Sequence, residues 1–138
     1  MAHEHIVYMM LTDAAAQLGD GDAIDRYATL LEPLVDKDVH RPYQAVAHRG
    51  RGIAYRLRGD FNKAGDHLSK ALQIFQDMDA AWQLGRTHCA LAQLEIDRSN
   101  HKGAYDQYLQ ALEKFERVQA LPEMKRTRAA LEGVELAE

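Results

Sequence analysis

The sequence is poor in residues that cross-link a chain or interrupt helices. Its 138 residues include one cysteine, three prolines and nine glycines. A single cysteine, Cys89, excludes an intramolecular disulfide and is typical of a reducing compartment, so we expect a cytoplasmic protein. The shortage of proline and glycine, with abundant Ala, Leu, Gln, Glu and Arg, favours helix along the whole chain. We therefore expect an all-α protein without strands.

The sequence also lacks a long apolar run. The apolar segment from Ile6 to Leu11 is far shorter than the roughly 20 residues that span a bilayer, and no basic segment precedes it. We therefore expect neither membrane insertion nor export. The length and the 46% hydrophobic content predict one domain that covers residues 1–138.

The chain repeats itself at an offset of 40 residues. Gly59-Asp60 aligns with Gly19-Asp20, and Phe115 aligns with Phe75. A repeat of this length predicts helix pairs stacked as a solenoid. We expect Asp22 to cap the second helix and Pro33 to break it near its end. Apolar spacing places helices at about residues 3–18, 23–35, 42–58, 61 to the turn at 78–79, 80–97, 101–118 and 122–136.

The second 40-residue repeat, which begins at about Ala45, carries a known pattern of small and aromatic residues. Counted from Ala45, the eighth, eleventh, fifteenth, seventeenth, twentieth, twenty-fourth and twenty-seventh positions are Gly52, Tyr55, Gly59, Phe61, Ala64, Leu68 and Ala71. The segment resembles a tetratricopeptide repeat (TPR), in the longer 40-residue variety found in bacterial signalling and regulatory proteins. The resemblance implies a right-handed superhelical solenoid of antiparallel helix pairs. Its repeats would cover about residues 5–40, 45–80 and 85–120, with a capping helix at about 121–136.

The same resemblance implies a non-enzymatic protein–protein interaction module with a concave groove lined by the first helix of each pair. Guanidinium groups bind carboxylates in a bidentate manner, so we expect an acidic peptide or partner segment in this groove. The family's lining positions fall first on Ile6, Met9, Asp13, Ala16, Val46, Ile96 and Ala129. The remaining ones form the predicted peptide-binding groove: Arg49, Ile53, Arg56, Arg86, Cys89, Gln93 and Arg126.

Other interpretations remain open at this point. The arginines could belong to a solvated helix face that nearby acids neutralise. The chain could be the sensor or regulatory C-terminal segment of a larger signalling or transcription-regulating protein. A helical small-ligand-binding or enzymatic domain is an alternative of another class. A homodimer is a further option, because the apolar strip from Ile6 to Leu11 could bury against a second copy.

Several kinds of site are disfavoured by the pattern of residues. Within the arginine-rich stretch from Arg41 to Gly59, Arg49-Gly50-Arg51-Gly52 could bind nucleic acid, but the chain is acidic overall, with a net charge of -4 and a pI near 6.0. His48 and His88 lie one repeat apart, which is too far to share a metal ion, so we expect packing or hydrogen-bonding roles.

The sequence also predicts neither a calcium loop nor a catalytic centre. Asp20-Gly21-Asp22 begins like a calcium loop, but Asp25 and Leu31 stand where glycine and glutamate are needed. No catalytic set is evident, and we expect Cys89 to be a space-filler. We expect no catalytic residue, no metal and no cofactor.

Overall fold

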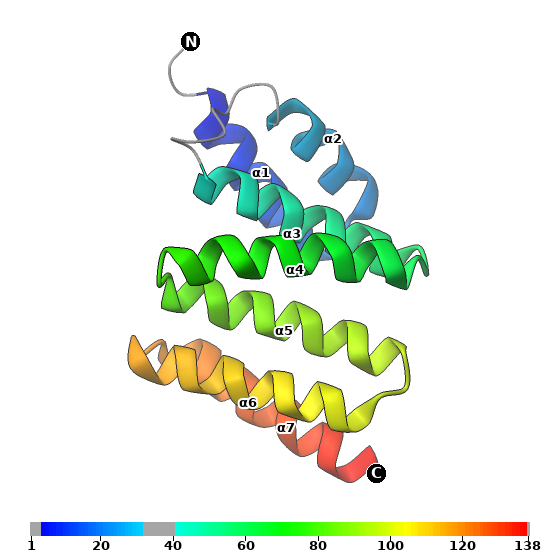
Figure 1. Ribbon diagram of the computed structural model, residues 1–138, viewed down its shortest axis with the longest axis vertical. Coiled ribbons are helices and arrows are strands. Elements are labelled where there is room, and N and C mark those ends of the chain that lie inside the picture. The colour runs from blue at the N-terminus through cyan, green and yellow to red at the C-terminus, as the bar shows by residue number, and fades with distance from the viewer. Residues whose placement is uncertain (1–3, 32–40, 138) are drawn as a thin grey trace. The chain divides into compact units, whose positions relative to one another are not determined.

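The part of the chain described by the computed structural model, residues 4–31 and 41–137, is helical with no strand (Figure 1). This confirms the all-α prediction for those residues. None of the described helices is both long and apolar enough to cross a bilayer. The predicted helix end near Pro33 and the connection after it lie outside the described residues. The helices are α1 (Glu4–Leu18), α2 (Gly21–Leu31), α3 (Arg41–Leu57), α4 (Phe61–Asp77), α5 (Ala81–Asp97), α6 (His101–Arg117) and α7 (Leu121–Ala137).

The helix ends follow a register of 20 residues. The amide of Gly59 donates to the carbonyl of Arg56 (3.0 Å), and the amide of Asp60 donates to that of Tyr55 (2.9 Å). This pair of bonds is the Schellman motif, which places the residue after the helix in the left-handed region. The same bonds recur at each of the other described turns. The left-handed residues are Gly19, Gly59, Asp79, Ser99 and Gln119.

Helix starts alternate with a period of 40 residues. The side chains of Asp20, Asp60 and Asn100 accept hydrogen bonds from the third amide beyond them, at 3.0–3.2 Å, and so cap α2, α4 and α6. Ala80, before α5, makes no side-chain cap. The predicted cap at Asp22 is therefore wrong by two residues, because helix α2 already begins at Gly21 and Asp20 is its flanking residue.

Contacts divide the chain into two compact units, Met1–Ile74 and Phe75–Glu138, which are described separately. In the first unit α1, α2 and α3 pack against one another. Small residues on α3 make the close contacts. A Cβ on Gly50 would lie 2.9 Å from Thr12 Cγ2, and a Cβ on Gly52 would lie 2.6 Å from Leu68 Cγ. Glycine at position 52 therefore allows α3 to approach α4 closely.

In the second unit α6 packs against both α5 and α7. A core cluster of Ala92, Ala104, Tyr108, Leu131 and Val134 joins the three helices. At the other end of α5, Gly85 lies against the ring of Phe115; a Cβ there would be 2.6 Å from Cε1. The exposed residues of α7 are mixed: charged side chains alternate with apolar ones such as Leu121 and Leu136.

Candidate functional site

Two helices of the second unit bring a tryptophan, two arginines and the cysteine together. We call Trp82, Arg86 and Cys89 of α5, with Arg126 of α7, the α5–α7 surface. The guanidinium carbon of Arg86 lies 4.9 Å from the centre of the Trp82 ring, a cation–π arrangement. Trp82 is 39% exposed, so its ring holds the Arg86 head group and still faces solvent.

Cys89 is the residue through which α5 touches α7 at this surface. Its sulfur lies 3.9 Å from the Thr127 hydroxyl oxygen of α7. Burial raises the pKa of the Cys89 thiol, while the hydrogen bond to Thr127 and the charges of Arg86 and Arg126 act more weakly in the opposite direction. The thiol itself stays protonated at neutral pH, in agreement with a space-filling role.

Gln93, another predicted groove residue of α5, and Arg126 each have a partner within the second unit. Gln93 donates a 2.7 Å hydrogen bond to the buried Tyr108 hydroxyl, which fixes its amide. Arg126 is 72% exposed and pairs with Glu123 at 3.3 Å. Exposed pairs of this kind are weak, so Arg126 can exchange Glu123 for a carboxylate of a ligand at little cost.

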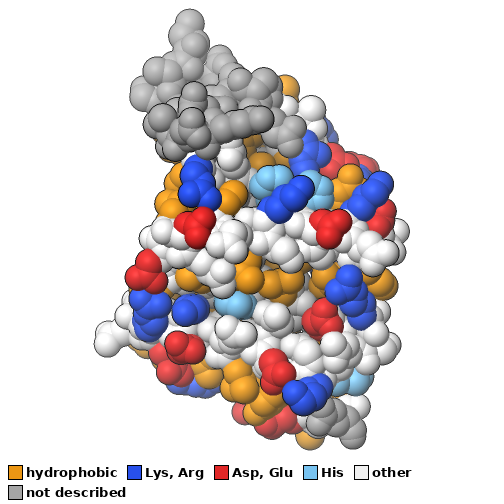
Figure 2. All heavy atoms as spheres, viewed as in Figure 1, with side chains coloured by type: hydrophobic (Ala, Val, Ile, Leu, Met, Phe, Trp, Pro, Cys, Tyr) orange, Lys and Arg blue, Asp and Glu red, His pale blue; other side chains and the backbone are white. Residues whose placement is uncertain are grey.

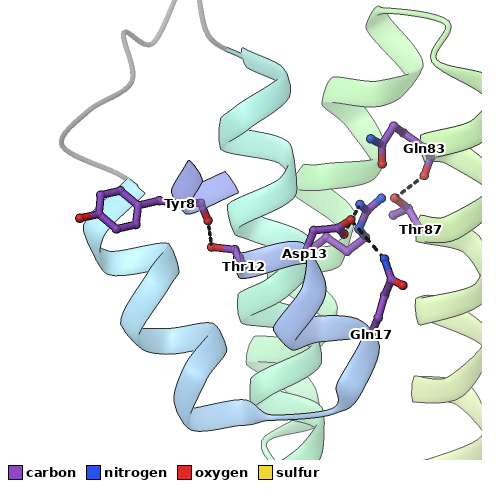
Figure 3. A network of polar contacts seen from close by, with 7 residues as sticks. Tyr8, Thr12, Asp13, Gln17, Gln83 and Thr87 are labelled. Carbon is purple, nitrogen blue, oxygen red and sulfur yellow. Dashed lines mark hydrogen bonds and ion pairs between the residues drawn. The ribbon is translucent and has the colours of Figure 1, made fainter. Parts of the chain in front are cut away.

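The predicted groove residues of the first unit have a different environment. Arg49 is only 2% exposed and donates to Asp13 at 3.2 Å. Asp13, which also accepts from Gln17, is labelled in Figure 3. Ile53 packs against the cluster that contains Ala15, and Arg56 is half-buried on the last turn of α3. Arg49 therefore serves an ion pair between α1 and α3. That these residues share a groove with Arg86 and Arg126 stays a prediction.

Two buried threonines, Thr12 and Thr87, form hydrogen bonds within the helices that carry these groups. Within α1 the Thr12 hydroxyl donates to the Tyr8 carbonyl, and within α5 the Thr87 hydroxyl donates to the Gln83 carbonyl (Figure 3). Each bond returns to the preceding turn of its own helix, so it gives the buried hydroxyl an acceptor on the same helix.

The arginine-rich stretch of α3 is mostly engaged with the rest of its unit. Besides the pair of Arg49, Arg51 donates to the Thr29 hydroxyl, and Arg58 pairs with Asp22 and Asp25. On the face shown in Figure 2, acidic and basic side chains are interspersed and not gathered by sign. These contacts engage Arg49, Arg51 and Arg58 within the first unit.

The histidines form hydrogen bonds between helices. His48 Nδ1 lies 3.0 Å from His67 Nδ1, and at the corresponding place in the second unit His88 Nδ1 lies 2.8 Å from Gln107 Oε1. Burial lowers the pKa of His88, more than the hydrogen bond to Gln107 raises it. Within residues 4–31 and 41–137, no group of three or more His, Cys, Asp or Glu side chains could hold a metal ion.

The sequence placed Arg86, Cys89, Gln93 and Arg126 at one surface, but it missed the part that Trp82 plays. The available signal was its spacing, because residues four apart on a helix lie on the same face. No family model matches the chain, and no match is found among curated proteins.

Proposed function

We propose that the protein is a non-enzymatic protein–protein interaction module that binds an acidic peptide or partner segment at the α5–α7 surface. The observation that carries this proposal is the partly exposed cation–π pair of Arg86 and Trp82 on α5, beside the 3.9 Å contact of Cys89 with Thr127 of α7, the helix that also carries Arg126. Two guanidinium groups beside an exposed tryptophan suit a ligand that carries carboxylates next to apolar or aromatic groups.

Preorganisation supports this role. Arg86 is held over the Trp82 ring, and Gln93 is fixed by Tyr108, so these groups lose little freedom when a ligand binds. The surface also stands on helices and not on a loop, which keeps the spacing between its charges constant. We expect a carboxylate to take the place of Glu123 beside Arg126.

We further propose that the helices form a TPR-like solenoid of antiparallel pairs. The support is the 20-residue register of turns and the 40-residue alternation of caps, which are what repeated helix pairs would produce. In such a solenoid the first helices line one concave side, and α5 and α7 are both first helices.

Intrinsic fluorescence tests the binding proposal, because Trp82 is the one tryptophan of the chain. The probe is a tryptophan-free peptide in which glutamate alternates with alanine, with a free C-terminus. We expect a saturable change in emission and a Kd that rises at least tenfold in Arg86→Ala/Arg126→Ala, because each lost charged hydrogen bond costs about 1.5–3 kcal/mol. A matched peptide with glutamine in place of glutamate should not bind.

The control variant is Arg98→Ala/Arg128→Ala. It removes the same charge, from the residue after α5 and from α7, but these arginines pair with Glu95 and Glu116 and lie outside the proposed site. Its Kd should match that of the wild type. Equal losses in both double variants would show non-specific attraction and would refute the proposed site.

A further inference from the structure

Helix α1 exposes an apolar face. Val7, Met10 and Leu18 are 51%, 61% and 84% exposed, and Ala14 between them is exposed as well. Their spacing of three, four and four residues places all four on one side of the helix. The opposite side of α1, with Thr12 and Ala15, is buried in the first unit.

The 40-residue repeat identifies the residues of α3 that correspond to the exposed apolar face of α1. The residues of α3 that correspond to Val7, Met10 and Ala14 are Ala47, Gly50 and Ala54. All three are buried against the pair α1–α2. Ala47 packs with Ala28 and Leu31, Gly50 faces Thr12 and Ile24, and Ala54 packs with Ala15 and Ile24.

In the second unit the same side of α7 packs in the same way. On α7 the corresponding residues Ala130 and Val134 pack against the cluster built by α5 and α6. In both units, therefore, this side of a first helix is the one that packs on the preceding helix pair. Helix α1 presents the same side to solvent.

The side chains on α1 differ from their counterparts in size and charge. Met10 stands where α3 has Gly50, at which even a Cβ would lie 2.9 Å from Thr12 Cγ2. A helix pair could not approach α1 as closely as α1–α2 approaches α3. At the position that corresponds to Leu18, Arg58 follows α3 and Arg98 follows α5. The side chains on the exposed face of α1 are thus larger than their counterparts at the centre of α3, and they are uncharged. They fit a contact in which the axes of two helices lie farther apart.

We propose that this face binds α1 of a second copy of the chain, with the two helices antiparallel. In that pairing Val7 lies opposite Leu18 of the second copy, and Met10 lies opposite Ala14. Large residues then meet small ones at the centre, as interlocking helices require. Helix α1 contains no Lys or Arg to attract an acidic partner, so the contact desolvates no basic group. The antiparallel helix dipoles also favour it.

The expected dimer is weak. One stripe of four residues covers less than the roughly 800 Å² per partner of a standard interface, so we expect a Kd on the order of 10–100 μM. The contact lies in the first unit, apart from the α5–α7 surface, and it does not depend on the function proposed for that surface.

Sedimentation of the full chain over about 1 μM to 1 mM tests the dimer. Leu18→Arg introduces the residue type that directly follows α3 and α5 at the corresponding position, so the fold should tolerate it. The substitution should raise the Kd of the dimer at least tenfold. Leu136→Arg makes the same change at a leucine of α7 that is 88% exposed, and it should leave the Kd unchanged. A wild type that stays monomeric throughout, or equal losses in both variants, would overturn the proposal.

Cross-linking tests the orientation in a Cys89→Ser background. Val7 and Leu18 lie about 16 Å apart along the helix. Oxidising a mixture of Val7→Cys and Leu18→Cys chains should give the mixed disulfide dimer, whereas Val7→Cys alone should give none. Efficient cross-linking of Val7→Cys with itself would contradict the antiparallel arrangement.

Discussion

Gly52 offers a sharp test of the close packing between α3 and α4. An added Cβ would lie 2.6 and 2.8 Å from Leu68 Cγ and Cδ2, and 3.1 Å from the backbone carbonyl oxygen of Ala64. Overpacking of this kind costs about 1–3 kcal/mol. The higher helix propensity of alanine returns about 1 kcal/mol. We therefore expect Gly52→Ala to lower the free energy of unfolding by about 1 kcal/mol, measured by urea denaturation followed by circular dichroism.

Gly133 provides the matched control. It also lies inside a helix, but a Cβ there would meet nothing within 4 Å. Gly133→Ala should therefore raise the free energy of unfolding by about 1 kcal/mol. The two substitutions are chemically identical, so the opposite signs isolate the packing contribution. If Gly52→Ala stabilised the protein as much as Gly133→Ala does, the close approach of α3 to α4 would be refuted.

A double-mutant cycle identifies the clashing partner. Leu68→Ala alone should cost about 2–5 kcal/mol, because it leaves a cavity in the core. In that background the Cβ at position 52 has room, so Gly52→Ala should become neutral or stabilising. An unchanged cost of Gly52→Ala in the Leu68→Ala background would show that Leu68 is not the obstacle.

Three further predictions concern single positions of the second unit. Gln119 has a φ of 53°, so Gln119→Gly should raise the free energy of unfolding by about 1 kcal/mol in the same urea assay; no gain would mean that the left-handed turn carries no strain. Because burial lowers the pKa of His88, the unfolded chain takes up this proton first as the pH falls. Stability should therefore drop below about pH 6.5, with a shallower decline in His88→Gln, and equal slopes would contradict the assignment. The buried Cys89 thiol should react with iodoacetamide more slowly than free cysteine, and Arg86→Ala should slow it further by raising the thiol pKa; faster alkylation would contradict that.

The helices and several turns were predictable because their causes are local. Gly19 and Gly59 end helices since glycine adopts the left-handed conformation at little cost, and Asn100 caps α6 with a residue type that favours this position. A turn was predicted at 78–79, where Asp79 adopts this conformation, whereas Gln119 adopts it without any sequence signal. There the turn is imposed by the helices on either side, which both continue in register.

The candidate site was predictable only in part, because burial depends on tertiary packing. Arg49 and Asp13 were both predicted at lining positions, yet they bond to each other in the first unit. Arg86 and Arg126 carry the same kind of charge, but Arg86 lies over the Trp82 ring and Arg126 is 72% exposed. Nothing in the local sequence separates the two cases, since the difference lies in which side chain of another helix can reach the guanidinium.

Arginine side-chain NMR tests the central claim of acidic-segment binding most directly. Titration of the ¹⁵N-labelled chain with the glutamate–alanine peptide should shift the Nε–H signals of Arg86 and Arg126 together, with one shared Kd. The signals of Arg98 and Arg128 should stay in place. Shifts of all four arginines alike, or of none, would contradict binding at the α5–α7 surface.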